Sequence, residues 1–285
     1  MNTSKKLISL LLCVSFVCAC FTGCSSKGGE KYNDETLIIG YTESVSPFLE
    51  VDKNGKATGF MADLWKAIFD TVKGDLKNYK FEKVEEGYSL EESGGFVDSN
   101  GKEYSAGLLM GAVSKNNGTF NEDYSFTEPV ITNRVIAVVG KNSNIKTYAD
   151  FADAAAVTVS DTARQAFENN KAISSVCKSV ADAKNIDEAL DMLDSGEADV
   201  VVTDEFSFMP SKRVKSYTVL DKELETIEYV IACAKYSGWK DSINEAIREY
   251  KSEKYNKNGD EFTPLVKKHF GYNASSFNYE TEGDK

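Results

Sequence analysis

The chain has 285 residues, of which 41% are apolar and 27% are charged, a composition typical of soluble globular proteins with one or two domains. Its formal net charge of -12 argues against nucleic acid and anionic membrane surfaces as partners, because both need clustered Lys and Arg. The sequence holds one His and no CxxC pair, so we expect no metal site and no cofactor.

The amino-terminal residues have the pattern of an export signal. In residues 1–23, two lysines precede an apolar run over residues 7–17, which is shorter than the about 20 residues that a membrane-spanning helix needs. Residues 21–24, FTGC, resemble the lipobox of bacterial lipoproteins, in which the cysteine is acylated. We therefore expect Cys24 to carry a lipid anchor on the outer face of the bacterial cytoplasmic membrane, followed by a flexible tether over residues 24–36. The alternative is an ordinary secretory signal.

After the tether, the pattern predicts a strand, a loop, a turn and a helix. Residues 36–40, TLIIG, form a short apolar strand, and residues 41–48, YTESVSPF, follow as a loop that can be one wall of a ligand site. Residues 52–55, DKNG, predict a hairpin turn. The periodicity of residues 59–69 predicts a helix with an inner face of Phe60, Leu64, Ala67 and Ile68.

The next segment predicts strands separated by an unusual insertion. Residues 79–84 alternate apolar and polar side chains as a strand does, and residues 108–113 form an apolar strand. Between them, residues 85–104 are rich in Gly, Ser, Asn and acids, which predicts a long loop that is either functional or mobile. Residues 130–139, VITNRVIAVV, form an apolar strand long enough to pass from one domain into the next.

A second group of α/β elements follows. It begins with a short helix within residues 145–151 and a strand over residues 156–159. A helix over residues 163–169 comes next, and either Asp161 or Thr162 stands where its cap is expected. The free N–H groups and the positive dipole end of this helix can bind a carboxylate. A plain helix cap is the alternative.

Residues 185–206, NIDEALDMLDSGEADVVVTDEF, predict a helix that leads into a buried strand. Gly196 can end the helix, whose single apolar face holds Ile186, Ala189, Leu190 and Leu193. Because residues 200–202 are apolar in succession, the strand is expected to be covered on both faces, as in a parallel sheet. Such sheets bind ligands beyond the carboxyl ends of their strands, and Asp204 lies at that end. A solvated strand end is the alternative for Asp204.

The carboxyl-terminal part predicts a second long strand and two helices. Residues 228–235, EYVIACAK, are expected to pair with residues 130–139, which gives two crossings between domains. An amphipathic helix over residues 239–251 places Ile243, Ala246, Ile247 and Tyr250 inside, and residues 262–269 form another helix. Residues 273–285 form a polar tail.

Taken in order, these elements resemble the family 3 solute-binding proteins of ABC transporters, the polar amino acid binding family. The resemblance extends from about residue 37 to residue 271. It rests on four segments, each weak alone but specific in this order: LIIGYTESVSPFLEVDKNGKATGFMADLWKAI, SFTEPVITNRVIAVVGKNSNIKTYADFADAAAVTVSDTA, NIDEALDMLDSGEADVVVTDEF and YVIACAK.

The resemblance implies an α/β, two-lobed periplasmic-binding-protein-like (type II) fold with two hinge strands. Lobe one would hold residues 37–131 and 229–272, and lobe two residues 132–228, with the ligand in the cleft between lobes that close over it. The two cysteines that follow Cys24 in the chain, Cys177 and Cys233, would fall in different lobes. We therefore expect two buried free thiols and not a disulfide.

The resemblance also implies roles for individual residues. In the family, an acid at the position of Asp204 takes the α-ammonium group, and a hydroxyl and backbone N–H at the position of Thr162 bind the α-carboxylate. The usual T-x-x-R arginine of lobe one is missing, because residues 114–117 are SKNN. Arg164 is the best substitute and Lys115 the second choice, although either can equally be a surface charge.

The first loop departs from the family as well. The aromatic side chain that often stacks on the ligand aligns with Val45, although Tyr41 and Phe48 lie nearby in sequence. These departures weaken the expectation of an α-amino acid more than that of a small polar ligand. The expected ligand-binding residues are Asp204, Thr162, Asp161, Arg164, Tyr41, Glu43, Phe48 and Ser114.

The expected function is that of a monomeric, lipid-anchored, extracytoplasmic substrate-binding protein that delivers an amino acid or similar solute to an ABC permease. A ligand-binding sensor or orphan binding module of the same fold is the alternative. An enzyme such as a dehydratase is a remote third possibility, because carboxylates such as Glu43 and Asp204 are all that the sequence offers for acid–base chemistry.

Overall fold

The computed structural model describes most of the chain after the predicted tether. The described residues are 36–84, 89–90, 96–97, 101, 103–104, 107–114, 124–252 and 260–272. The predicted signal peptide, Cys24, nearly all of the tether, Lys115 and the polar tail lie outside these ranges. Among the helices of these ranges, none combines the length and the apolar character needed to cross a membrane.

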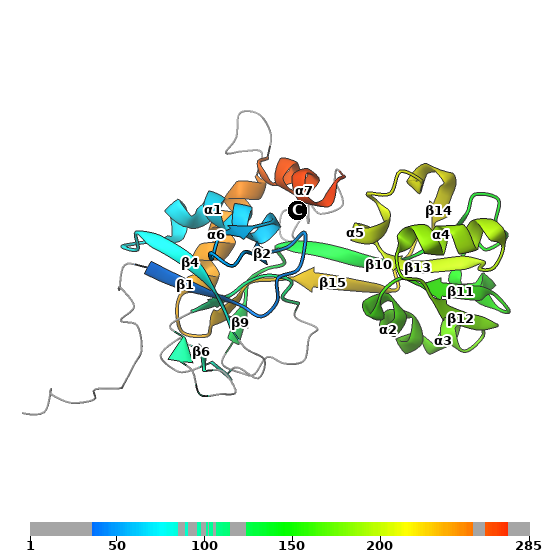
Figure 1. The fold of residues 1–285 in the computed structure, drawn as a ribbon, viewed down its shortest axis with the longest axis horizontal. Helices are drawn as coiled ribbons and strands as arrows, with labels where there is room; N and C mark the ends of the chain where they lie inside the picture. Colours follow the sequence, from blue (N-terminus) through cyan, green and yellow to red (C-terminus); the bar gives the residue numbers. More distant parts are fainter. Residues whose placement is uncertain are drawn as a thin grey trace, which may run out of the picture. The chain divides into compact units, whose positions relative to one another are not determined.

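The first sheet has five strands in the order β4-β1-β8-β16-β9. Its strands are β1 (Thr36–Tyr41), β4 (Asn78–Lys83), β8 (Leu108–Leu109), β9 (Tyr124–Phe126) and β16 (Ala232–Ala234). β1 is parallel to both β4 and β8, and β16 is antiparallel to β8 and β9. One apolar cluster joins this sheet to α1 (Phe60–Val72), α6 (Trp239–Lys251) and α7 (Phe262–Phe270). Figure 1 shows these three helices next to one another beside the sheet.

The second sheet has the order β12-β11-β13-β10-β14, with β15 also paired to β10. Its strands are β10 (Ile131–Gly140), β11 (Ala155–Thr158), β12 (Ser179–Asp182), β13 (Val200–Asp204), β14 (Tyr217–Val219) and β15 (Glu225–Tyr229). Its helices are α2 (Asp161–Asn169), α3 (Lys171–Ser174), α4 (Ile186–Ser195) and α5 (Glu205–Phe208), with short 3-10 turns at Tyr148–Phe151 and Val214–Ser216.

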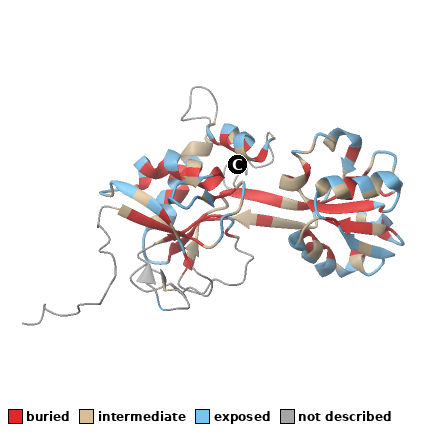
Figure 2. Ribbon diagram, viewed as in Figure 1, coloured by how far each residue is buried: buried red, intermediate tan, exposed pale blue. Residues whose placement is uncertain are grey.

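Both faces of β13 are covered, as the run of three valines predicts. Val200 and Val202 pack in one cluster with α2 and α3, whereas Val201 packs in another cluster with α4 and α5. All three side chains are 0% exposed, and Figure 2 shows β13 and β10 buried over most of their length. The helix α4 ends as expected at Gly196, whose left-handed backbone (φ 77°) few other residues adopt.

The predicted long strand over residues 228–235 is wrong as a single element. β15 pairs antiparallel with β10, with Tyr229 opposite Ile131, which confirms the expected partner. The chain then leaves β10: Val230 donates its N–H to Val113, Ile231 bonds to Thr127, and β16 joins the first sheet. The strand breaks because the backbone of its first half forms hydrogen bonds with the second sheet, whereas the backbone of its second half forms them with the first sheet. The lobe boundaries at residues 131/132 and 228/229 stay predictions.

Two smaller expectations are also corrected. In α1, Ala67 is exposed, whereas Trp65 is fully buried, because the buried face is centred on the side of Met61, Trp65 and Phe69 and Ala67 lies beyond its edge. In the insertion, the described residues form short antiparallel strands and not a plain loop: β5 (Ser89–Leu90), β6 (Phe96–Val97) and β7 (Glu103–Tyr104).

The strand predicted over residues 108–113 is confirmed only at Leu108–Leu109, and most other local predictions agree with the structure. The turn over residues 52–55 joins β2 (Glu50–Val51) to β3 (Ala57–Thr58) in an antiparallel hairpin. α6 spans the predicted residues, with Tyr250 only partly buried. Cys177 and Cys233 are free thiols, the first partly buried and the second buried. Burial raises the pKa of the Cys233 thiol to about 12, so it is protonated at neutral pH.

Candidate functional site

The carboxyl ends of parallel strands bring the predicted ligand-binding residues to two sheet edges. β11 and β13 are parallel neighbours, so the loop that opens α2 and the residue Asp204 follow strands that end at the same edge. β1 and β8 are likewise parallel neighbours, so the loop over residues 42–48 and the loop over residues 110–114 lie at one edge of the first sheet. Such edges are where open α/β sheets bind ligands.

Asp204 is held by neutral donors. It is the last residue of β13 and the N-cap of α5, and its Oδ1 accepts hydrogen bonds from Asn133 Nδ2 (3.1 Å) and Ser207 N (3.0 Å). Its Oδ2 accepts from Ser207 Oγ at 2.8 Å. A carboxylate can accept about four hydrogen bonds, so the partly buried Oδ2 keeps capacity for another donor. Within the described residues, Asp204 forms no ion pair.

Asn133 is a site residue that the sequence reasoning missed. It lies on β10, is 3% exposed, and its Oδ1 accepts a hydrogen bond from Phe206 N at 3.3 Å while Nδ2 donates to Asp204. Asn133 also forms a hydrogen bond with the Tyr229 hydroxyl. Burial of that hydroxyl has the largest effect on its pKa and, together with the charge of Asp204, raises the pKa to about 12, whereas the hydrogen bond lowers it. A polar residue inside the apolar run VITNRVIAVV was the available signal, because a buried amide must find partners.

Glu205, the neighbour of Asp204, is bound in the opposite way. Its side chain is 6% exposed and faces Arg134, which donates from Nε to Oε2 at 2.9 Å and from Nη2 to Oε1 at 2.5 Å. This contact raises the pKa of Arg134 above its ordinary value. Two successive residues of β10 thus hold two successive acids: Asn133 binds Asp204 without compensating its charge, and Arg134 neutralises Glu205.

Aromatic rings gather around Phe206, the second residue after Asp204. The Phe206 ring is 6.2 Å from that of Tyr229 and nearly parallel to it, 4.3 Å from that of Phe270, and 5.8 Å from that of Phe48. Phe48 and Tyr229 are 4.3 Å apart, and Ser114 forms a β-bridge with Tyr229. The predicted residue Phe48 is thus 5% exposed, belongs to the core of the first sheet and contacts Phe206 and Tyr229, two residues that the sequence reasoning did not select.

The loop that carries Phe48 is fixed by the start of α1. Phe60 N donates to Pro47 O (2.9 Å) and Met61 N to Phe48 O (2.8 Å). Gly59 is required at this junction, because its φ is +101° and a Cβ there would lie 2.8 Å from Phe48 O. In the same loop Glu43 is exposed, whereas Tyr41 is buried in the core of the first sheet and burial raises its pKa.

The N-terminus of α2 differs from the expectation. The helix begins at Asp161, and its cap is Ser160, whose Oγ accepts from Ala163 N at 3.1 Å, so neither Asp161 nor Thr162 is the cap. Both are exposed in the first turn. Arg164 pairs with Glu168 (2.6 Å) and Asp182 (3.1 Å). Among the described residues, no hydrogen bond or ion pair links this turn to Asp204, and its role in ligand binding stays a prediction.

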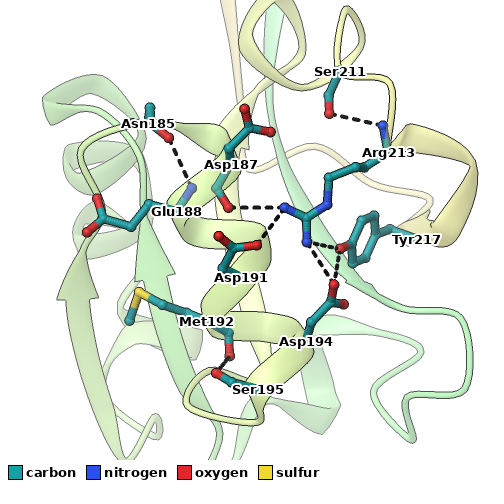
Figure 3. Close-up of polar contacts among 10 residues, drawn as sticks. All are labelled: Asn185, Asp187, Glu188, Asp191, Met192, Asp194, Ser195, Ser211, Arg213 and Tyr217. Carbon is teal, nitrogen blue, oxygen red and sulfur yellow. Dashed lines mark hydrogen bonds and ion pairs between the residues drawn. The ribbon is translucent and has the colours of Figure 1, made fainter.

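Every arginine of the chain is paired with a carboxylate. The sequence contains four arginines, and the structure describes all of them. In Figure 3, the guanidinium of Arg213 lies between Asp191 (2.8 Å), Asp194 (2.7 Å) and the Tyr217 hydroxyl (2.9 Å). These contacts tie the end of α4 to the segment that leads into β14. The partners of the other three are Glu205 for Arg134, Glu168 and Asp182 for Arg164, and Glu128 for Arg248.

The comparisons with known proteins agree with this architecture. No family model matches the chain. A curated relative, the probable ABC transporter arginine-binding protein ArtJ of Chlamydia trachomatis, is 33% identical over 104 residues, which is 31% of this chain and 40% of that protein. The match therefore spans less than half of the relative's length.

Solved structures match over most of the chain. A polar amino acid ABC uptake transporter substrate-binding protein from Streptococcus thermophilus has a TM-score of 0.60 at 21% identity, covering 84% of this chain and 87% of that one. The L-cystine solute receptor of Neisseria gonorrhoeae has a TM-score of 0.59 at 17% identity, covering 84% and 94%. The resemblance found in the sequence is confirmed, and the chain has the periplasmic-binding-protein-like α/β fold of the family 3 solute-binding proteins.

Proposed function

We propose that this chain is an extracytoplasmic substrate-binding protein that captures an amino acid or similar small polar solute and delivers it to an ABC permease. Two observations support a binding role and not a catalytic one: the fold, and the name of the curated relative, which describes an ABC transporter arginine-binding protein. The observation that carries the proposal is Asp204, a carboxylate at a parallel-sheet edge whose charge no described cation neutralises.

In this proposal, Asp204 binds the ammonium group of the ligand. A charge-assisted hydrogen bond of this kind contributes about 1.5–3 kcal/mol, more than a neutral one. The loops at the two sheet edges, with Phe48 and Ser114 on one and Thr162 on the other, supply the remaining contacts. A polar ligand must lose its water to be bound, so contacts from both sheets are needed to replace the lost hydrogen bonds.

Ligand binding would then favour a closed form of the protein, in which residues from both sheet edges contact the ligand at the same time. A ligand shifts such an equilibrium only by the difference in its affinity for the two forms. Recognition of the liganded form by a permease follows from that shift, because the unliganded protein would rarely present the same surface.

A thermal-shift screen of the purified body, residues 25–285, tests the proposal. The compounds are the common amino acids, small peptides and polyamines. A ligand at a hundred times its Kd stabilises the folded state by about 2.7 kcal/mol, which raises the Tm of a chain of this size by about 5 °C or more. The absence of a shift with every compound would contradict the proposal.

We further propose that acylation of Cys24 anchors the protein to the membrane. A Cys24→Ala variant of the full chain is expected to incorporate no labelled fatty acid, since the thiol that would be acylated is removed. A Cys233→Ala variant, which changes only a buried thiol of the body, serves as the control and should be labelled like the original chain. Fatty-acid labelling of the Cys24 variant would show that the lipobox interpretation is wrong.

A further inference from the structure

We infer that the site recognises the positive charge of its ligand and does not require a carboxylate, so that its ligands are organic cations. Amino acids with a cationic side chain belong to this class, and so do the amines that remain when their carboxylate is removed. The inference rests on the proposed binding function and narrows the chemistry of the same site.

The contrast between the two consecutive acids is the first argument. Glu205 is buried and receives a bidentate ion pair from Arg134, whereas Asp204 is partly exposed and, among the residues that the structure describes, receives only neutral donors, from Asn133 and Ser207. The three hydrogen bonds to Asp204 fix the direction of its carboxylate without neutralising it. A preoriented carboxylate with an uncompensated charge suits a cation supplied from outside the chain.

The arginines give the second argument. A planar, two-bond clamp on a ligand carboxylate is specific to arginine, because lysine presents only a point charge. Arg134 and Arg248 each use the Nε–Nη2 edge for an internal carboxylate, and Arg164 uses Nε and Nη1. Arg213 uses both Nη atoms. At every arginine in the chain, a ligand carboxylate would therefore share the guanidinium with an internal carboxylate that already balances its charge.

The start of α2 gives the third argument. This helix terminus is the other place where a carboxylate was expected to bind, through Thr162 and free N–H groups. Its first turn already contains the carboxylate of Asp161, and Ser160 Oγ already accepts the N–H of Ala163. A negative side chain in the first turn offsets the positive end of the helix dipole, so a second carboxylate gains less there.

The aromatic rings around Phe206 complete the argument. Phe206 is separated from Asp204 by one residue, and its ring is nearly parallel to that of Tyr229 at 6.2 Å. Both side chains are partly exposed. Aromatic faces attract ammonium and guanidinium groups, so the rings favour the same charge as the carboxylate. They offer no hydrogen-bond donor to a ligand carboxylate except the Tyr229 hydroxyl, which already forms a hydrogen bond with Asn133.

Matched pairs of ligands test the inference. Calorimetric titration of the same purified body compares L-arginine with agmatine and L-lysine with cadaverine, so that each pair differs by one carboxylate. We expect each amine to bind within tenfold of its amino acid. A loss of tenfold or more on removal of the carboxylate would overturn the inference and leave the proposed function in place.

Two further outcomes separate the inference from the function. If none of the four compounds binds while another amino acid shifts the Tm, the inference is wrong and the binding function stands. If nothing in the whole screen binds, both fall. As a check on the site, Asp204→Asn should lower the affinity for the amine and for its amino acid by the same factor. Asp187 is an exposed acid in the first turn of α4, so Asp187→Asn should change neither affinity.

Discussion

Replacement of Asp204 by asparagine is expected to weaken the binding of an ammonium-bearing ligand by about ten- to hundredfold, with little loss of stability. The affinity falls because a charge-assisted bond worth about 1.5–3 kcal/mol becomes a neutral one. The fold is preserved because asparagine caps helices about as well as aspartate and can still accept the N–H of Ser207. Titration calorimetry gives the affinity, and urea denaturation gives the free energy of unfolding.

Two comparisons make this result specific to the site. The Asp187→Asn variant removes the same charge from the chain, so it controls for the change in overall electrostatics. Substitution of Asn133 by leucine should also weaken binding, because the Asp204 carboxylate loses one of the two donors that fix its Oδ1. An Asp204→Asn protein that bound the ligand with unchanged affinity would remove Asp204 from the site.

Replacement of Arg134 by methionine is expected to destabilise the fold by about 2–3 kcal/mol. Loss of one partner of a buried ion pair costs about 3–5 kcal/mol, because the other charge stays buried and unpaired. We expect less here, since the Arg134 side chain is 37% exposed and water can partly solvate the site, whereas Glu205 is only 6% exposed. Urea denaturation of both proteins measures the difference.

Arg248 provides the matched control, because it makes the same two-bond contact with Glu128 at the surface. The side chains of that pair are 60% and 40% exposed, so Arg248→Met should cost only about 0–1 kcal/mol. The double replacement Arg134→Met with Glu205→Leu should recover most of the lost stability, because no charge is then left buried. Equal losses in the two single variants would show that burial does not govern the Arg134 pair.

The Arg134 pair also bears on the site. Glu205 opens α5, and Asp204 caps the same helix, so the ion pair holds the turn on which both Asp204 and Phe206 depend. A weaker pair should therefore reduce ligand affinity as well as stability. Asp204→Asn, in contrast, should reduce affinity alone, which distinguishes a residue that contacts the ligand from one that positions the turn.

The sequence by itself determined the elements whose causes are local. The three- and four-residue spacing of Ile186, Ala189, Leu190 and Leu193 specifies a helix, Gly196 specifies its end, and the three successive valines after it specify a strand covered on both faces. The bounds of α6 follow from periodicity in the same way. Asp204 could be placed at a strand end without any knowledge of the fold, because its position depends only on its neighbours in the chain.

Only the tertiary structure decided what surrounds Asp204 and which charges remain uncompensated. Asn133 lies 71 residues before it in the chain, yet it donates to the Asp204 carboxylate. Arg164 was a reasonable choice for a ligand clamp until Asp182, 18 residues away, was seen to bind it. Whether a charged group is free for a ligand depends on which other groups the fold brings within hydrogen-bond distance. Residue type and local spacing do not predict those long-range neighbours.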